Sequence, residues 1–100
     1  MKRSEIIVLI VDDNSSVRNL LSLCIQERGY SFLLAANGKQ ALSISRAYPG
    51  KIDVLLSDVD MPQMNGFDLA KQLIKERPGV RVLMISGVER ATFGLPFLNS

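Results

Sequence analysis

The chain has 100 residues, of which 47% are hydrophobic and 22% are charged, and its formal net charge is +2. This length suits one small domain spanning residues 1–100, and this composition excludes an intrinsically disordered chain. Because the net charge is small and the Lys and Arg residues are scattered, we expect no binding of nucleic acid.

The content of cysteine and histidine narrows the chemistry further. One cysteine, Cys24, excludes an internal disulfide and predicts a reducing compartment, and its helical spacing favours a core role over a reactive thiol. The absence of histidine excludes histidine catalysis and histidine metal ligands. No signal-peptide pattern and no apolar run of membrane-spanning length is present. We therefore expect a cytoplasmic protein that does not contact membranes.

Strand and helix patterns alternate along the chain as far as residue 85. The first strand pattern is continuously apolar and β-branched, which is typical of a strand buried on both faces. Asn, Gly and Pro residues mark the helix boundaries. The predicted elements are a strand at 5–11, a helix at 15–28, a strand at 31–36, a helix at 38–48, a strand at 52–57, a helix at 66–77 and a strand at 80–85.

This alternation predicts an α/β fold with a doubly wound parallel sheet and right-handed crossovers. After Ser86 the pattern deteriorates. Residues 87–94 are too few for a good helix, and residues 95–98 could form a short fifth strand. We expect some apolar surface to remain uncovered, which would lower stability or would be covered by a second molecule.

Three aspartates stand where apolar strands should end. Asp12 and Asp13 follow the first strand, and Asp58 follows the third. Because carboxyl ends of parallel strands share one edge of a sheet, the three carboxylates should converge there. Converging carboxylates need a cation, and Mg²⁺ suits a few oxygen ligands plus a phosphate. An Asp beside Mg²⁺ can accept a phosphoryl group as a nucleophile.

Simpler interpretations exist for each of these features. The sequence Asp12-Asp13-Asn14 could serve only as a helix cap, although a facing Asp58 makes that interpretation less attractive. Ser86 ends the fourth strand at the same edge and could donate to a phosphoryl oxygen, or it could form only a turn with Gly87. Asp60 could supply its backbone carbonyl to a metal. Phe93 and Phe97 are typical core residues rather than switch residues. The basic residues Lys71, Lys75, Arg77 and Arg81 are expected on a solvated margin formed by the third helix and the fourth strand.

Three motifs, in this order and spacing, resemble the receiver domain of two-component response regulators. They are Val11-Asp12-Asp13, the run 56–66 (LSDVDMPQMNG), and Met84-Ile85-Ser86-Gly87. The resemblance implies a flavodoxin-like sheet with strand order 2-1-3-4-5.

The resemblance also implies the roles of the site residues. Asp58 would be the phosphoacceptor, receiving its phosphoryl group from a phosphohistidine on a sensor histidine kinase or a phosphotransfer protein. Asp12 and Asp13 would hold Mg²⁺, Asp13 more directly, together with Asp58 and the backbone carbonyl of Asp60. Ser86 would bind the phosphoryl group and draw its loop inward, and the aromatic that accompanies such a switch would be Phe97.

The chain departs from the family pattern near its end. Ser100 stands where the family carries a Lys that pairs with the phosphoryl group, the fourth helix is shortened, and the last helix is missing. Coupling of phosphorylation to a conformational change is therefore in doubt. The missing elements belong to a face that family members use for dimerisation, so a homodimer through the exposed C-terminal face is a further expectation.

Three functional hypotheses follow. The leading one is a phosphoaccepting signalling domain that modifies itself and is no multiple-turnover enzyme. A pseudo-receiver, which binds partners without switching, is the alternative. A remote possibility is a phosphatase of the haloacid-dehalogenase type, because Asp58-Val59-Asp60 matches its Asp-x-Asp motif. That motif follows the third strand here, and the other parts of such an enzyme are absent. A nucleotide-binding role lacks both a glycine-rich fingerprint and a P-loop.

Overall fold

The computed structural model describes residues 6–85. Within this range strands and helices alternate as the sequence predicts. The elements are β1 (Ile7–Val11), α1 (Ser15–Glu27), β2 (Ser31–Ala35), α2 (Gly38–Ala47), β3 (Val54–Asp58), α3 (Gly66–Glu76) and β4 (Arg81–Ile85). The third strand includes Asp58 as its last residue, whereas the sequence pattern ended that strand one residue earlier.

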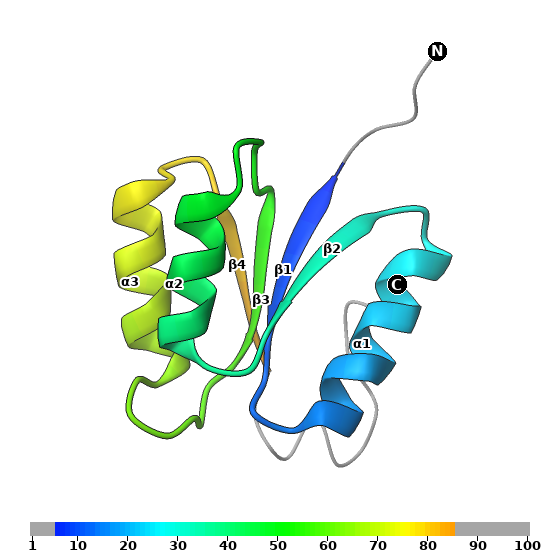
Figure 1. Cartoon of the computed structure of the whole chain (residues 1–100), viewed down its shortest axis with the longest axis horizontal. Helices are drawn as coiled ribbons and strands as arrows, with labels where there is room; N and C mark the ends of the chain where they lie inside the picture. The colour runs from blue at the N-terminus through cyan, green and yellow to red at the C-terminus, as the bar shows by residue number, and fades with distance from the viewer. Residues whose placement is uncertain (1–5, 86–100) are drawn as a thin grey trace.

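The strands form one parallel sheet in the order β2-β1-β3-β4. Helix α1 covers one face of the sheet, and α2 and α3 cover the other (Figure 1). The predicted flavodoxin-like order is thus confirmed for the first four strands. The expected fifth strand, shortened fourth helix and missing last helix all fall outside the described residues.

A separate apolar cluster lies on each face of the sheet. On the face of α2 and α3, Leu9 and Leu55 pack against helix residues such as Leu69. On the face of α1, Ile10 and Leu56 pack against helix residues such as Leu21. Successive residues of β1 and β3 therefore point to opposite faces and are buried on both, which explains the continuous apolar runs of these central strands.

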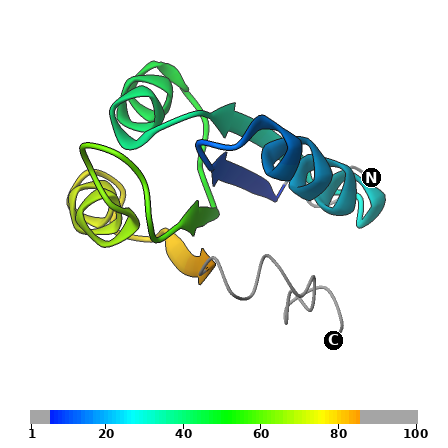
Figure 2. The same ribbon diagram turned by 90° about the horizontal axis from the view of Figure 1, so that it is seen from below.

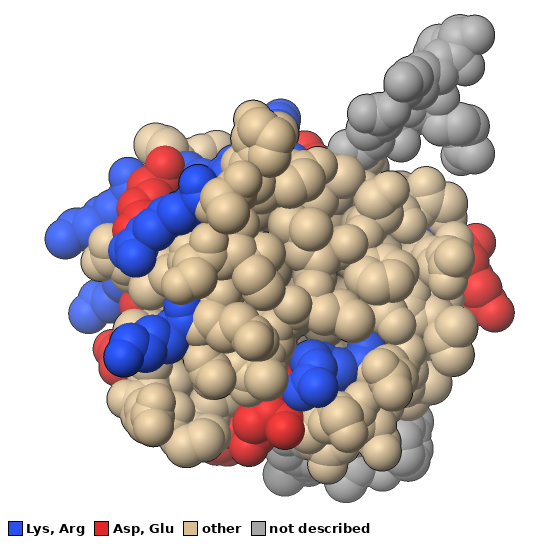
Figure 3. All heavy atoms as spheres, in the orientation of Figure 1, with Lys and Arg blue, Asp and Glu red and all other residues tan. Residues whose placement is uncertain are grey.

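The loops that leave the carboxyl ends of β1, β2 and β3 lie along the lower edge of the molecule in Figure 1, and Figure 2 views the molecule from that side. In the face shown in Figure 3, acidic side chains appear at this lower edge, whereas basic side chains gather over α2 and α3. A basic side chain lies directly beside the acidic ones at the lower edge, so positive charge is present there as well (Figure 3).

The helix faces are narrower than the sequence pattern suggests. The spacing of Phe67, Ile74 and Leu20 placed them on buried faces, but their exposed fractions are 56%, 44% and 41%. Within α3, the residues that reach the core are Leu69, Ala70 and Leu73. Cys24, which was expected in the core, is only half-buried and is not among the described residues of either apolar cluster.

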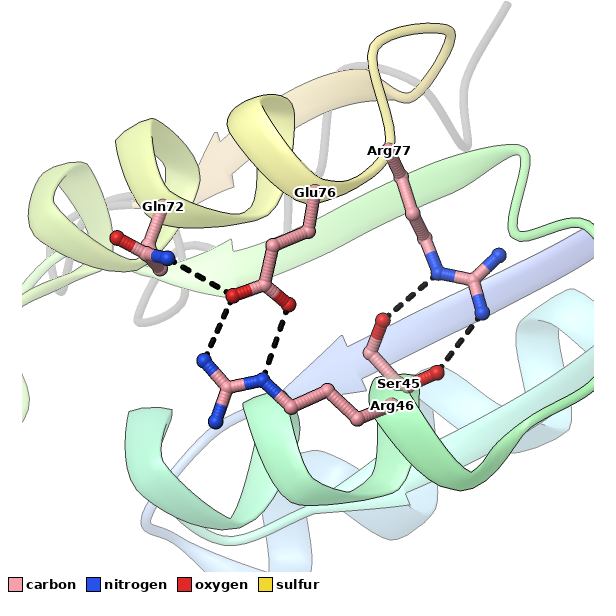
Figure 4. A network of polar contacts seen from close by, with 5 residues as sticks. All are labelled: Ser45, Arg46, Gln72, Glu76 and Arg77. Atoms are coloured by element: carbon pink, nitrogen blue, oxygen red, sulfur yellow. Dashed lines mark hydrogen bonds and ion pairs between the residues drawn. The ribbon is translucent and has the colours of Figure 1, made fainter.

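A polar network joins the C-terminal ends of α2 and α3 (Figure 4). We call Ser45, Arg46, Gln72, Glu76 and Arg77 the α2–α3 clamp. The guanidinium of Arg46 makes two hydrogen bonds to the Glu76 carboxylate, at 2.6 and 3.1 Å, and Gln72 donates a third at 2.8 Å. The hydrogen bond from Arg46, aided by that from Gln72, lowers the pKa of Glu76 to about 2.

The prediction for Arg77, the other arginine of the clamp, is wrong. Arg77 does not lie on a solvated margin: its guanidinium donates to the hydroxyl and carbonyl of Ser45 and to the carbonyls of Tyr48 and Gly50, all at 2.7–2.8 Å. Carbonyls at a helix C-terminus lack partners within the helix, and a cation there also complements the helix dipole. Arg77 therefore caps α2 from the end of α3.

Across residues 6–85, none of the helices combines the length and the apolar character that crossing a membrane would require.

Candidate functional site

Three carboxylates converge at the carboxyl edge of the sheet, as predicted. Asp12 and Asp58 are almost fully buried, with exposed fractions of 0% and 1%, whereas Asp13 is exposed. One carboxylate oxygen from each residue lies within 4.8 Å of the other two. We call these three residues the acidic edge.

The end of β1 holds Asp12 in place through its own backbone and side chain. Its amide donates to the carbonyl of Ala35 at 3.2 Å, and its Oδ1 accepts from the amide of Asn14 at 2.9 Å. The side chain of Asn14 in turn accepts from the amides of Ser16 and Val17 and so caps α1. The cap is thus Asn14, which leaves the Asp13 carboxylate available for another role.

The end of β3 holds Asp58 opposite Ile85 of β4. The next residue, Val59, donates to the carbonyl of Ile85 at 3.1 Å and accepts from the amide of Gly66 at 2.9 Å. A Cβ at Gly66 would overlap the carbonyl oxygen of Asp58 and would approach Met84 Sδ to 3.0 Å. Only glycine therefore allows α3 to begin this close to Asp58.

The loop between Asp58 and α3 contains a tight turn. Met64 donates to the carbonyl of Pro62 at 2.7 Å, and Gln63 between them has a φ of 72°, which is the geometry of a γ-turn. Asn65 then caps α3 by accepting from the amide of Asp68 at 2.9 Å. The rigid turn that the sequence indicated here is present.

The chemistry of the acidic edge fits a hard divalent cation. Three carboxylates this close, two of them buried, repel one another unless positive charge lies among them. Oxygen donors of this kind suit Mg²⁺, which needs only a few protein ligands and completes its shell with water or phosphate oxygens. The donor set therefore fits the Mg²⁺ ion that the sequence suggested, with Asp12, Asp13 and Asp58 as its side-chain ligands.

The remaining predicted site residues are Asp60 and residues that the structure does not describe. The Asp60 side chain is exposed and is not part of the cluster, while its amide donates to Asp58 Oδ1 at 3.3 Å. Its role as a carbonyl ligand stays a prediction. Ser86 and Phe97, as well as Ser100 at the position of the expected Lys, lie outside the described residues.

One residue of the site was missed by the sequence reasoning. The Arg18 guanidinium donates from Nη1 to the backbone carbonyl of Asp12 at 2.7 Å and is half-buried. A cation so near the N-terminus of a helix opposes the helix dipole, and α1 has no acidic residue in its first turn. This unfavourable placement is the sequence signal that could have identified Arg18.

A parallel sheet of order 2-1-3-4 with an acidic cluster at its carboxyl edge defines a class of α/β domains that bind ligands at that edge. The family model described as "Response regulator receiver domain" matches residues 8–97. The chain belongs to this family, which confirms the resemblance seen in its motifs.

Curated relatives carry this domain within longer proteins. The chain is 37% identical over 86 residues to the sensor kinase CckA of Brucella abortus, covering 86% of this chain and 9% of CckA. It is 30% identical over 89 residues to the probable transcriptional regulatory protein TcrX of Mycobacterium tuberculosis, covering 86% of this chain and 37% of TcrX. The chain thus spans less than half the length of either relative.

Solved structures show the same fold. The chemotaxis protein CheY4 of Vibrio cholerae aligns with a TM-score of 0.75 and 30% identity, over 97% of this chain and 82% of CheY4. The response regulator TrrA of Thermotoga maritima, solved in complex with Mg²⁺ and BeF, aligns with a TM-score of 0.75 and 28% identity, over 90% and 76% of the two chains. A further structure holds TrrA together with the histidine kinase ThkA (TM-score 0.71, 29% identity, 82% of this chain and 69% of that one).

Proposed function

We propose that this receiver domain accepts a phosphoryl group on Asp58 in a Mg²⁺-dependent reaction. The observation that carries the proposal is the convergence of Asp12, Asp13 and Asp58, two of which are buried although they are carboxylates. A purely structural sheet edge gains nothing from bringing three like charges together. Phosphoryl transfer to a carboxylate, by contrast, requires a fixed nucleophile and ligands for a cation at one place.

In the proposed reaction, one carboxylate oxygen of Asp58 attacks the phosphorus atom of a phosphohistidine on a partner protein. The new O–P bond forms as the N–P bond breaks, and the departing imidazole nitrogen keeps the electron pair and takes a proton from water. Asp58 is held for this attack by strand pairing with β4 and by the close approach of α3 at Gly66. Positioning of this kind, rather than covalent chemistry by further residues, accounts for most of the rate in phosphoryl transfer.

Asp12 and Asp13 would hold the cation, together with the carbonyl of Asp60. When bound, Mg²⁺ would neutralise the negative charge of the phosphoryl oxygens and of the acidic edge. The exposed position of Asp13 gives it the freer access from solvent, whereas Asp12 is held by its bonds to Ala35 at the end of β2 and to the Asn14 amide in the loop.

The class of partner follows from the same reaction, so we propose a sensor histidine kinase or a phosphotransfer protein as the donor. The complex of ThkA with TrrA is one such pair in a related structure. A cytoplasmic location is part of the proposal and agrees with the single cysteine. We also propose that the domain modifies itself once per cycle and turns over no separate substrate. Dimerisation through a C-terminal face would depend on residues outside the described range.

The test is the intact mass of the protein after incubation with a small acyl-phosphate donor, with and without Mg²⁺, alongside Asp58→Asn. We expect the added mass of one phosphoryl group only with Mg²⁺ and only in the unsubstituted protein. Labelling of Asp58→Asn at an unchanged rate would refute the assignment. Absence of an adduct on a folded protein would favour the pseudo-receiver, and repeated turnover of a phosphate ester would favour the phosphatase.

A further inference from the structure

Arg18 is a basic residue of α1 that reaches back to the acidic edge. Its Nη1 lies 2.7 Å from the carbonyl oxygen of Asp12, six residues earlier in the chain. The remainder of its hydrogen-bonding capacity is not used within residues 6–85, since this is its one hydrogen bond to the described part of the chain. The side chain therefore links the second turn of α1 to the loop that carries Asp12 and Asp13.

Within residues 6–85, Asp12 takes part in hydrogen bonds of different origin. The bond from the Asp12 amide to Ala35 belongs to the main chain, and the bond from the Asn14 amide to Asp12 Oδ1 forms within the loop itself. Among these bonds, the one from Arg18 comes from a side chain six residues further along the chain. It is also charge-assisted, which makes it stronger than a bond between neutral groups.

We propose that Arg18 is a positioning residue that holds the loop of Asp12 and Asp13 in the geometry that binds Mg²⁺. This inference rests on the proposed function and adds a residue to it. Arg18 acts through the Asp12 carbonyl and touches neither the cation nor the phosphoryl group.

Two possible roles of Arg18 predict opposite changes in Mg²⁺ affinity when the residue is replaced, so an experiment can distinguish them. If the guanidinium acts only as a nearby positive charge, its loss should tighten Mg²⁺ binding by removing repulsion. If it acts as a positioning residue, its loss should weaken Mg²⁺ binding because the carboxylates are no longer held together. The proposal requires the second outcome.

The test compares Arg18→Met, Arg18→Lys and Arg81→Met by Mg²⁺ titration of the whole chain, followed by calorimetry or by amide resonances. Methionine keeps an apolar stem without a donor, lysine keeps a donor and a charge, and Arg81 is an exposed arginine at the opposite edge of the sheet. Losing one charge-assisted hydrogen bond should weaken Mg²⁺ binding roughly five- to tenfold in Arg18→Met. Arg18→Lys should recover most of the affinity, and Arg81→Met should bind Mg²⁺ like the unsubstituted protein.

Phosphorylation by a small donor separates positioning from general damage. At saturating Mg²⁺, Arg18→Met should regain the rate of the unsubstituted protein, because only the Mg²⁺ concentration at half-maximal rate has changed. In the metal-free variant, the Asn14 amide should exchange its hydrogen faster, while the amides of β1 should stay protected. That measurement needs only the folded state and no bound ligand.

Equal or tighter Mg²⁺ binding by Arg18→Met would overturn the proposal, as would a slow rate that saturating Mg²⁺ does not restore. A failure of the proposed function gives a different result. In that case the unsubstituted protein itself would show neither Mg²⁺ binding nor a phosphoryl adduct.

Discussion

The acidic edge and the α2–α3 clamp both gather charged side chains, but they do so in opposite ways. In the clamp, Arg46 meets the Glu76 carboxylate and Arg77 meets the carbonyls that end α2. At the acidic edge, three carboxylates of the same sign lie within 4.8 Å. The two groups occupy opposite edges of the sheet, because the helices run antiparallel to the strands.

The difference teaches which charges serve stability and which serve chemistry. Matched charges and capped carbonyls stabilise the metal-free fold, so removing one of them should lower stability and leave the site unaffected. Like charges held together repel one another, so removing one of them should relieve that repulsion and damage the site. The variants below test this contrast.

The largest expected effect on stability is at Arg77 in the clamp. Arg77→Met removes the hydrogen bonds to Ser45, Tyr48 and Gly50 and leaves the part-buried carbonyls of Ser45 and Tyr48 without this donor. We expect the free energy of unfolding to fall by about 2–3 kcal/mol, as measured by urea denaturation, with an unchanged rate of phosphorylation in the folded protein. Arg81→Met is the matched control and should lose little stability. If Arg77→Met were as stable as Arg81→Met, the result would contradict the role of Arg77 as a cap of α2.

The next largest effect on stability is expected at Gly66, where a substitution would displace the backbone of Asp58 in the acidic edge. Gly66→Ala places a methyl group against the carbonyl of Asp58, and the neighbouring Met84 leaves little room for it to move. We expect a loss of about 1–3 kcal/mol together with slower phosphorylation, because Asp58 must shift.

Gly79 supplies the comparison for this change, because a Cβ there meets nothing within 4 Å. Gly79→Ala should change neither stability nor rate appreciably. Equal behaviour of the two alanine variants would show that the approach of α3 to Asp58 is unimportant.

A smaller change in stability, of opposite sign, is expected for a substitution of Asp13. Asp13→Ala should stabilise the metal-free protein by about 0.5 kcal/mol, since the residue is exposed and its repulsion is screened. The same substitution should weaken Mg²⁺ binding roughly tenfold or more. Calorimetric titration measures the affinity, and Glu27→Ala, an exposed acidic residue at the far end of α1, serves as control. A Mg²⁺ titration unchanged by Asp13→Ala would exclude the residue as a ligand.

The smallest effect is the pH dependence of the ion pair in the clamp. The pKa of Glu76 is lowered to about 2 from an ordinary value of 4.5, so its carboxylate binds fewer protons in the folded state. The stabilisation is fully present above pH 4.5 and is lost as the pH falls towards 2. Urea midpoints of the unsubstituted protein and of Arg46→Met should therefore differ at neutral pH and converge below pH 4.5. The contribution of this ion pair to stability is small, because the side chains of Arg46 and Glu76 are 57% and 25% exposed and solvent screens their attraction. A difference independent of pH would assign Arg46 a packing role.

The fold and the acidic edge could be predicted from local patterns because each depends on short-range rules. The apolar runs before Asp12 and Asp58 predicted central strands, and parallel pairing then required both carboxylates to reach one edge. The clamp could not be predicted in this way. Arg77 lies 32 residues from Ser45, and no local pattern indicates which helix end a cation will meet.

The errors in the helices have a related cause. The spacing of Phe67 and Ile74 correctly indicated a helix, but periodicity alone does not say how wide a stripe the sheet will cover. The bond from Arg18 to the Asp12 carbonyl was missed because a side chain reaching back along its own helix leaves no periodic signal. Its only trace is a positive charge where the helix dipole disfavours one.

The central claim is that Asp58 itself carries the phosphoryl group, and locating the group on the chain tests this most directly. The protein would be phosphorylated with a small acyl-phosphate donor and Mg²⁺, then reduced with borohydride, which converts an aspartyl phosphate to homoserine. Peptide mass spectrometry should find homoserine at position 58 only when Mg²⁺ was present. Homoserine at position 12, 13 or 60 instead, or at no position in a folded protein, would contradict the account.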